Sequence, residues 1–245
     1  VSAGATVTMK ACTNNAEIRG GFYTGGFIGK VKEGTVSLTG CANKGNVFGE
    51  AQVGGMVGVT EPAADKTLNL TFDKCQNLGV ITANDADCGG FLGKADLQKG
   101  NLTGSITFTS CVNRGEVKAN TRLGGFVGKY GKNGSESSAN GAALNVPLHF
   151  EKCLNTANVT SKGWHTGGFL GYAYISEGME FRSCVNLGTV SGVGNVGGFF
   201  GYLFAHLGGN KTAKTAVLID CSVNAGTVTG TESNICGFGG HFTSW

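Results

Sequence analysis

The chain has 245 residues, a formal net charge of +3, 44 glycines, two prolines and only 14% charged residues. The two prolines exclude a collagen-like repeat, and a hydrophobic content of 40% excludes a disordered tract. Lys and Arg form no cluster, and no apolar run approaches the roughly 18 residues that cross a bilayer. We therefore expect no nucleic-acid partner and no transmembrane segment in this chain.

The sequence opens at Val1 without the charged and then apolar leader of a secreted precursor. We interpret the chain as a processed product or a segment of a longer protein.

A two-part motif recurs along the whole chain, and such a repeat decides the architecture. The first part reads CxNxGxV, and the second, after a short spacer, reads GGFxG. The cysteines are Cys12, Cys41, Cys75, Cys111, Cys153, Cys184 and Cys221. The asparagines are Asn14, Asn43, Asn77, Asn113, Asn155, Asn186 and Asn224. The seventh copy is read with one extra residue between Cys221 and Asn224.

Each repeat contains three predicted strands. The residues five and three before each Cys are apolar, as in Leu70 and Phe72, and this period of two is typical of strands. After the AsnxGly turn, a Val or Ile is followed two positions later by a small residue, which predicts a second strand, and GGFxG supplies the third. The pattern predicts an all-β fold, a parallel β-solenoid (β-helix) of about seven coils, each with three short strands, wound right-handed as parallel crossovers usually are.

We predict a single repeat domain over residues 1–245. Its coils are expected near 1–34, 35–66, 67–101, 102–143, 144–178, 179–214 and 215–245. Stacking at about 4.8 Å per coil gives a rod roughly 35 Å long, in which each motif position becomes a column of like residues.

The columns have predicted structural roles. The Asn column is interpreted as a ladder of turn amides, and the Cys column as buried, reduced thiols, with strained or alternating disulfides as the alternative. Cys88 and Cys236, in coils three and seven, would lie roughly 19 Å apart and could not pair. Phe and the next apolar residue of GGFxG would point to opposite faces of a straight strand, so a bend that turns both inward is favoured over an exposed column.

The joint presence of GGFxG and CxNxGxV resembles the GLUG-type repeat over essentially the whole chain. The resemblance implies a β-solenoid from a secreted or cell-surface protein, such as an adhesin or a cell-wall component. It implies little about activity, because a fold does not fix a function. The Asn two residues after Cys departs from many copies of that repeat.

Catalytic chemistry has one candidate location. Glu50, Asp85 and Asp87 lie at the corner before GGFxG in coils two and three, with Arg122 in the next coil. Carboxylates on adjacent coils could share acid and base work on a polysaccharide, although a hydrated corner is the favoured interpretation. His149, His165, His206 and His241 are scattered. We expect no catalytic residue, no metal site and no cofactor, and a polysaccharide lyase or hydrolase stays the alternative.

A binding surface is predicted at the residue after GGFxG. This column reads Lys30, Val59, Lys94, Lys129, Tyr172, Tyr202 and approximately His241. The cations Lys94 and Lys129 are adjacent, as are the aromatic Tyr172 and Tyr202, a combination that suits sugars or acidic polymers. Trp164 and His165 are added to this candidate site. The alternative is an outer face that merely stacks.

Variable insertions follow this column, the longest over 129–146 and 202–216, and would gather along one edge of the rod. Candidate N-glycosylation sequons begin at Asn69, Asn101, Asn133, Asn158 and Asn210. The expected function is a non-enzymatic extracellular or cell-surface repeat module, an adhesin or surface-coat segment. It would act as a rigid spacer and bind a glycan or a host or cell-surface protein at the edge that carries the insertions. The alternative is a structural subunit of a filament or sheath that binds further copies of itself through its coil ends or an apolar stripe.

Overall fold

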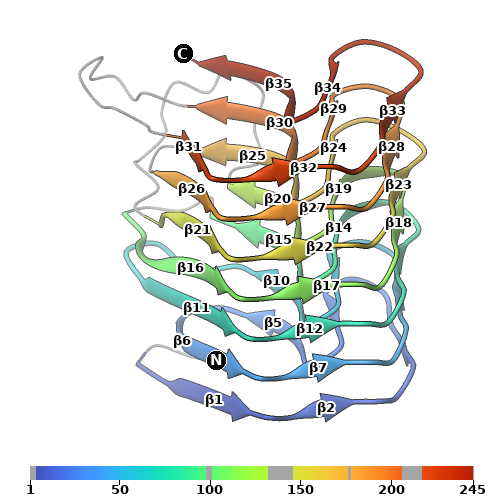
Figure 1. Cartoon of the computed structure of the whole chain (residues 1–245). Helices are drawn as coiled ribbons and strands as arrows, with labels where there is room; N and C mark the ends of the chain where they lie inside the picture. Colours follow the sequence, from blue (N-terminus) through green and yellow to red (C-terminus); the bar gives the residue numbers. More distant parts are fainter. Residues whose placement is uncertain (1–3, 98–100, 132–145, 176–177, 206–216, 245) are drawn as a thin grey trace.

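The structure is a computed structural model and describes residues 4–97, 101–131, 146–175, 178–205 and 217–244. These residues contain no helix and form five parallel sheets of seven strands, one strand of each sheet per coil. In Figure 1 the front strands run from left to right and the fainter rear strands return from right to left as the coils rise. The predicted all-β parallel solenoid of seven coils, wound right-handed, is confirmed.

The five sheets follow one another around each coil and are named A to E. Sheet A contains β1 (Thr6–Lys10), β6 (Gly34–Thr39), β11 (Thr67–Asp73), β16 (Thr103–Thr109), β21 (Leu148–Glu151), β26 (Met179–Arg182) and β31 (Val217–Asp220). Sheet B contains β2 (Thr13–Asn14), β7 (Ala42–Asn43), β12 (Gln76–Asn77), β17 (Val112–Asn113), β22 (Leu154–Asn155), β27 (Val185–Asn186) and β32 (Val223–Asn224). Sheet C contains β3 (Ile18–Arg19), β8 (Val47–Gly49), β13 (Ile81–Ala83), β18 (Val117–Ala119), β23 (Val159–Ser161), β28 (Val190–Gly192) and β33 (Val228–Gly230).

The last two sheets complete the coil. Sheet D contains β4 (Thr24–Gly25), β9 (Val53–Gly54), β14 (Ala86–Gly89), β19 (Thr121–Gly124), β24 (Thr166–Gly167), β29 (Val196–Gly197) and β34 (Ile235–Cys236). Sheet E contains β5 (Ile28–Val31), β10 (Val57–Thr60), β15 (Leu92–Asp96), β20 (Val127–Gly131), β25 (Leu170–Ile175), β30 (Phe200–Ala205) and β35 (Gly239–Ser244). Sheets A, C and E are the three predicted strands. The prediction of three strands per coil was wrong because sheets B and D continue the parallel pairing through short segments near the corners.

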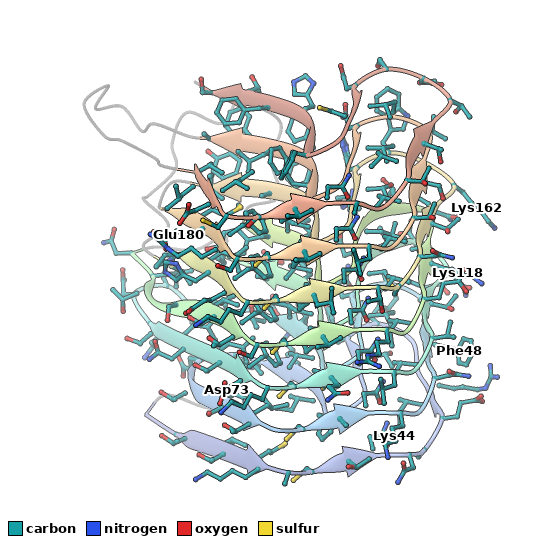
Figure 2. The ribbon with its side chains drawn as sticks, viewed as in Figure 1. Lys44, Phe48, Asp73, Lys118, Lys162 and Glu180 are labelled. Atoms are coloured by element: carbon teal, nitrogen blue, oxygen red, sulfur yellow. The ribbon has the colours of Figure 1, made fainter. Side chains whose placement is uncertain are left out.

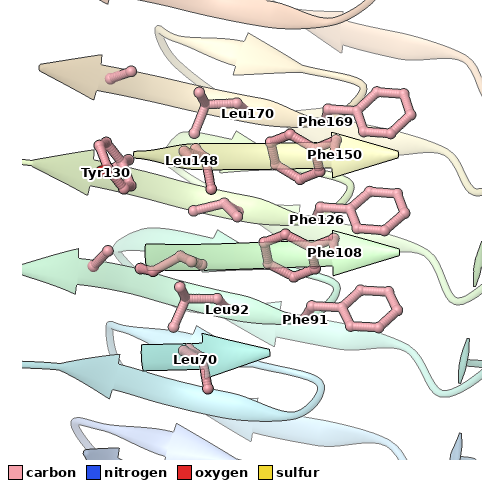
Figure 3. Packing of buried hydrophobic residues seen from close by; sticks show 14 of the residues in the cluster. Leu70, Phe91, Leu92, Phe108, Phe126, Tyr130, Leu148, Phe150, Phe169 and Leu170 are labelled. Carbon is pink, nitrogen blue, oxygen red and sulfur yellow. The ribbon is translucent and has the colours of Figure 1, made fainter. Parts of the chain in front are cut away.

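The larger core lies between sheets A and E. Phe108 of sheet A and Phe126 of the GGFxG motif belong to two stacks of parallel rings, and rings of opposite stacks meet edge to face, 5.8 Å between centroids (Figure 3). Leu92, the neighbour of Phe91 in its motif, is also fully buried. The predicted bend is therefore confirmed. The Phe91 carbonyl accepts hydrogen bonds from two successive amides of the preceding coil, so the chain turns a corner here.

A contact between the GGFxG glycine and the Asn of CxNxGxV divides the cross-section of the rod into two cores. The second glycine of each GG pair lies against the Asn amide of the next coil: a Cβ built on Gly90 would come within 2.5 Å of Asn113 Oδ1. On one side of this contact is the larger core, and on the other is a smaller core of sheets C and D that includes Val117 and Leu123. The glycine is required because any larger residue would displace the amide or the neighbouring backbone.

The Asn ladder is confirmed. Each of the first six asparagines donates a hydrogen bond from Nδ2 to Oδ1 of the Asn in the next coil, at 2.8–2.9 Å, so the ladder spans all seven coils. The five inner asparagines are fully buried. The ladder thus satisfies polar groups that would otherwise be costly inside the rod.

The Cys column differs from the prediction at its last position. The register places Ser222, not Cys221, opposite Cys184, because Arg182 pairs with Asp220 and Val185 with Val223. Ser222 donates to the Phe181 carbonyl, as the Cys184 thiol donates to the Phe150 carbonyl. Cys221 instead lies at the exposed corner with φ of 48°, so the seventh copy carries no extra residue.

All nine cysteines are free thiols in the structure. Cys88 is buried in the smaller core and Cys236 is exposed in the last coil. Burial raises the pKa of the Cys88 thiol well above its usual range, so this side chain behaves as a small apolar residue.

Candidate functional site

The predicted binding column lies on sheet E and is in register. Lys30, Val59, Lys94, Lys129, Tyr172, Tyr202 and His241 are paired consecutively from coil to coil. We call it the strand column. Lys94, Lys129 and Tyr202 are nevertheless buried, whereas the sequence predicted an outer face. The structure therefore confirms the register but not the exposure.

A second column, which the sequence analysis missed, packs against the first. It consists of the residue two positions before the first glycine of GGFxG, or before Cys236 in the last coil, and lies at or next to the start of sheet D. We call it the corner column. Its members are Tyr23, Gln52, Asp87, Arg122, His165, Asn195 and Asn234, and every one has a left-handed φ between 51° and 67°. Their chemical dissimilarity hides the column in the sequence, but their constant place before GGFxG could have revealed it.

Charged members of the two columns form ion pairs in the lower and middle coils. Lys30 pairs with Glu61, and Lys94 lies 2.7 Å from Asp96. Arg122 Nε donates to the buried Asp87 carboxylate at 2.5 Å. The Lys30–Glu61 and Arg122–Asp87 pairs link neighbouring coils, whereas Lys94 and Asp96 belong to the same strand, β15.

Burial controls the protonation of Lys129. Its pKa falls to about 8 because the ammonium group is desolvated, an effect that the nearby Asp87 carboxylate partly opposes. The Lys129 ammonium lies 5.3 Å from the centroid of the Tyr172 ring. The lysine therefore caps the aromatic part of the strand column by a cation–π contact.

The upper coils hold an aromatic and amide cluster. Tyr172 and Tyr202 stack with their centroids 5.2 Å apart, and His241 stacks on Tyr202 at 4.9 Å. His165 meets both tyrosines edge to face. Because Lys129 and His241 cover the outer ring faces of the tyrosine pair, an incoming sugar could meet these rings only at their edges.

The hydrogen bonds of the cluster define the tautomer of His165. Asn195 Nδ2 lies 3.0 Å from His165 Nδ1, and Asn234 Nδ2 donates to Asn195 Oδ1 at 2.7 Å. An amide NH₂ can only donate, so His165 Nδ1 accepts and Nε2 carries the proton. Burial lowers the pKa of His165 to about 4, with smaller contributions from Arg122, His241 and Lys129. The imidazole is thus neutral at pH 7.

Trp164 is the exposed aromatic residue beside this cluster. Its side chain is 37% exposed, and its indole lies over Gly194 of the next coil, where a Cβ would come within 2.7 Å of the ring. The ring is therefore held against the rod without being buried. Trp164 offers the kind of aromatic surface that the sequence analysis assigned to the tyrosines.

The candidate catalytic carboxylates lie in different environments. Asp87 is buried and pairs with Arg122, whereas Glu50 and Asp85 are exposed. The Glu50 carboxylate accepts a hydrogen bond from the Asn84 amide. Asp87 is therefore held by Arg122 away from solvent, whereas the other two carboxylates face solvent.

Several other candidate groups are placed by the structure. His149 lies 3.5 Å from Glu180 on sheet A. Asn69, Asn101 and Asn158 lie on the surface or at half-buried positions. His206, Asn133, Asn210 and most of the two long insertions lie outside the described residues. Among the residues that the structure describes, no group of His, Cys, Asp and Glu could hold a metal ion, and no helix is long and apolar enough to cross a membrane.

Comparisons of the chain with protein-family models, with curated proteins and with solved structures gave no match.

Proposed function

We propose that the chain is a non-enzymatic extracellular or cell-surface repeat module, of the adhesin or surface-coat type and akin to GLUG-type repeats. It serves as a stiff spacer and binds glycan or protein at the exposed corner that carries Trp164, next to the corner column. The observation that carries the proposal is the continuity of the Asn ladder and the Phe stacks from coil to coil, because such uninterrupted columns resist bending and local opening.

The binding role rests on Trp164. An exposed indole fixed against a rigid backbone can stack on a sugar ring, with Lys162 exposed nearby for an acidic group. We expect binding on a glycan array that Trp164→Ala abolishes. Leu187→Ala is the matched control, because Leu187 is a comparably exposed apolar side chain at another corner. A flat signal for the unaltered protein across a broad array would count against glycan binding.

The extracellular location has a separate test. Asn158 is exposed and lies in the sequon Asn158-Val159-Thr160. Expression through a secretory pathway should attach a glycan at this site, seen as a mass decrease after enzymatic deglycosylation and lost in Asn158→Gln. Secreted protein that carries no glycan at Asn158 would remove this support.

A second candidate function is end-to-end assembly with further copies. In the last coil Phe238 is 39% exposed on top of a Phe stack, and nothing lies within 4 Å of a Cβ built on Gly237. In the inner coils the equivalent glycine holds the Asn of the next coil, so the first coil of another copy fits this face. Light scattering should show concentration-dependent growth that Phe238→Lys prevents and Phe48→Lys, on the side of the rod, does not. A protein that stays monomeric at all concentrations would exclude this function.

A further inference from the structure

One half of the outer face of sheet A carries an unusually regular array of hydroxyl groups. In strands β1, β6, β11 and β16, the outward positions are Thr or Ser except at Lys10, Asn69 and Asp73. The hydroxyl residues are Thr6, Thr8, Thr35, Ser37, Thr39, Thr67, Thr71, Thr103, Ser105, Thr107 and Thr109. We call this surface the hydroxyl grid.

The charge distribution marks the boundary of the grid. In the next three strands of the same sheet, the outward positions are His149, Glu151, Glu180, Arg182, Leu218 and Asp220. Arg182 pairs there with both Glu180 and Asp220. Asp73 and Glu180, labelled in Figure 2, lie on the two halves of this face. A general preference of strands for Thr would not stop at one coil, so the half that is rich in hydroxyl groups is a distinct surface.

The hydroxyls of the grid are available to an external partner. Within the described residues, Thr67 and Thr103 bond to each other at 2.8 Å, and the remaining hydroxyls make no hydrogen bond to the protein. Each hydroxyl can donate one hydrogen bond and accept two. Threonine is stiff about χ1, so the hydroxyl and methyl positions are largely fixed by the backbone.

The parallel register makes the grid periodic in two directions. Thr8, Ser37, Thr71 and Thr107 are aligned across four strands. Neighbours are about 4.8 Å apart across the strands and about 6.7 Å apart along them. Such spacings are close to the distances at which oxygen atoms repeat on the surfaces of crystalline ice.

We propose that the hydroxyl grid binds ice. The partner must be periodic in two dimensions and rich in hydrogen-bonding groups, as an ice surface is. The two charged residues of this face, Lys10 and Asp73, lie in one column at the edge of the grid. The grid carries no aromatic side chain on which a sugar polymer could stack, and too little exposed apolar surface for a second copy of the chain. This activity is independent of the edge that contains Trp164.

The test is partition of the full chain into slowly growing ice. The unaltered protein should enter the ice, and Thr71→Lys, which places a long cation at the centre of the grid, should be excluded like a non-binding protein. His149→Lys is the matched control: His149 lies in the same column one coil beyond the grid, opposite Thr107, and the variant should still enter the ice. Circular dichroism establishes that each variant is folded, and Thr107→Lys provides a second variant within the grid.

Two results would overturn the proposal. One is exclusion of the unaltered protein from ice. The other is incorporation of Thr71→Lys and Thr107→Lys to the same extent as the unaltered chain.

Discussion

The Asn ladder makes a quantitative prediction at its centre. Asn113 accepts a hydrogen bond from Asn77 Nδ2 and donates one to Asn155 Oδ1, both at 2.9 Å, and its side chain is fully buried. Asn113→Ala removes both bonds and leaves a donor on Asn77 and an acceptor on Asn155 without partners. A buried polar group left in this way costs about 1–3 kcal/mol, so the two together should lower the free energy of unfolding by about 2–6 kcal/mol.

The control is the same substitution at the edge of the ladder. Asn14 is only partly buried and makes a single bond to another Asn, with Asn43. Solvent can satisfy the groups that Asn14→Ala exposes, so we expect a loss of about 1 kcal/mol.

Urea unfolding, followed by circular dichroism, measures the free energy of unfolding of both variants. Amide hydrogen exchange measures local opening in the flanking coils. Asn113→Ala should shift the midpoint clearly more than Asn14→Ala and increase exchange near Asn77 and Asn155. Equal midpoints for the two variants would refute the idea that the inner ladder stabilises the rod through satisfied buried amides.

Three further predictions concern other parts of the rod. Gly90→Ala should lower the free energy of unfolding by about 3 kcal/mol or more, because the added Cβ would lie 2.2 Å from the Gly125 carbonyl oxygen. Gly21→Ala is the control: its Cβ would have no atom within 4 Å, so the variant should be nearly neutral in the same urea assay. His165 has a folded-state pKa of about 4, below its ordinary value of 6.5, so the unfolded chain takes up a proton at higher pH than the folded chain does. The free energy of unfolding should therefore fall by up to ~3 kcal/mol as pH decreases from 6.5 to 4. His165→Gln should flatten the plot of stability against pH in that window, and an unchanged slope would contradict the lowered pKa of His165. Alkylation of the native protein followed by mass spectrometry should label the exposed Cys12, Cys221 and Cys236 and spare the six buried thiols, and rapid labelling of Cys111 would show that the larger core opens.

The sequence predicts the architecture well because the repeat samples each structural position seven times. The Cys, Asn and Gly positions recur at constant spacing, and the ladder and the inward Phe residues follow from that. Sheets B and D escaped prediction because most of their strands have only two residues, too few to show alternation. The position of Ser222 was missed because the motif was aligned on the cysteine. The apolar Val217 and Ile219, five and three residues before Ser222, carry the correct register.

The candidate site was only partly predictable. The strand column follows from spacing after GGFxG, but burial depends on what packs against each side chain. Spacing alone could not show that Lys94 and Lys129 are buried, or that Lys129 and His241 cover the outer ring faces of the Tyr172–Tyr202 pair. The left-handed corner residues, such as Asp87 and His165, were seen as separate charged or aromatic residues rather than as one column.

The hydrogen bonds between asparagines all point the same way, from each Nδ2 toward the C-terminal neighbour. This row of amides therefore has a polarity, with a donor at one extremity and an acceptor at the other. A coil inserted in the opposite orientation would place two amide donors or two amide acceptors opposite each other. Evolution or protein engineering can lengthen such a molecule by duplicating whole units in tandem, but a unit that enters in the opposite orientation would interrupt the row.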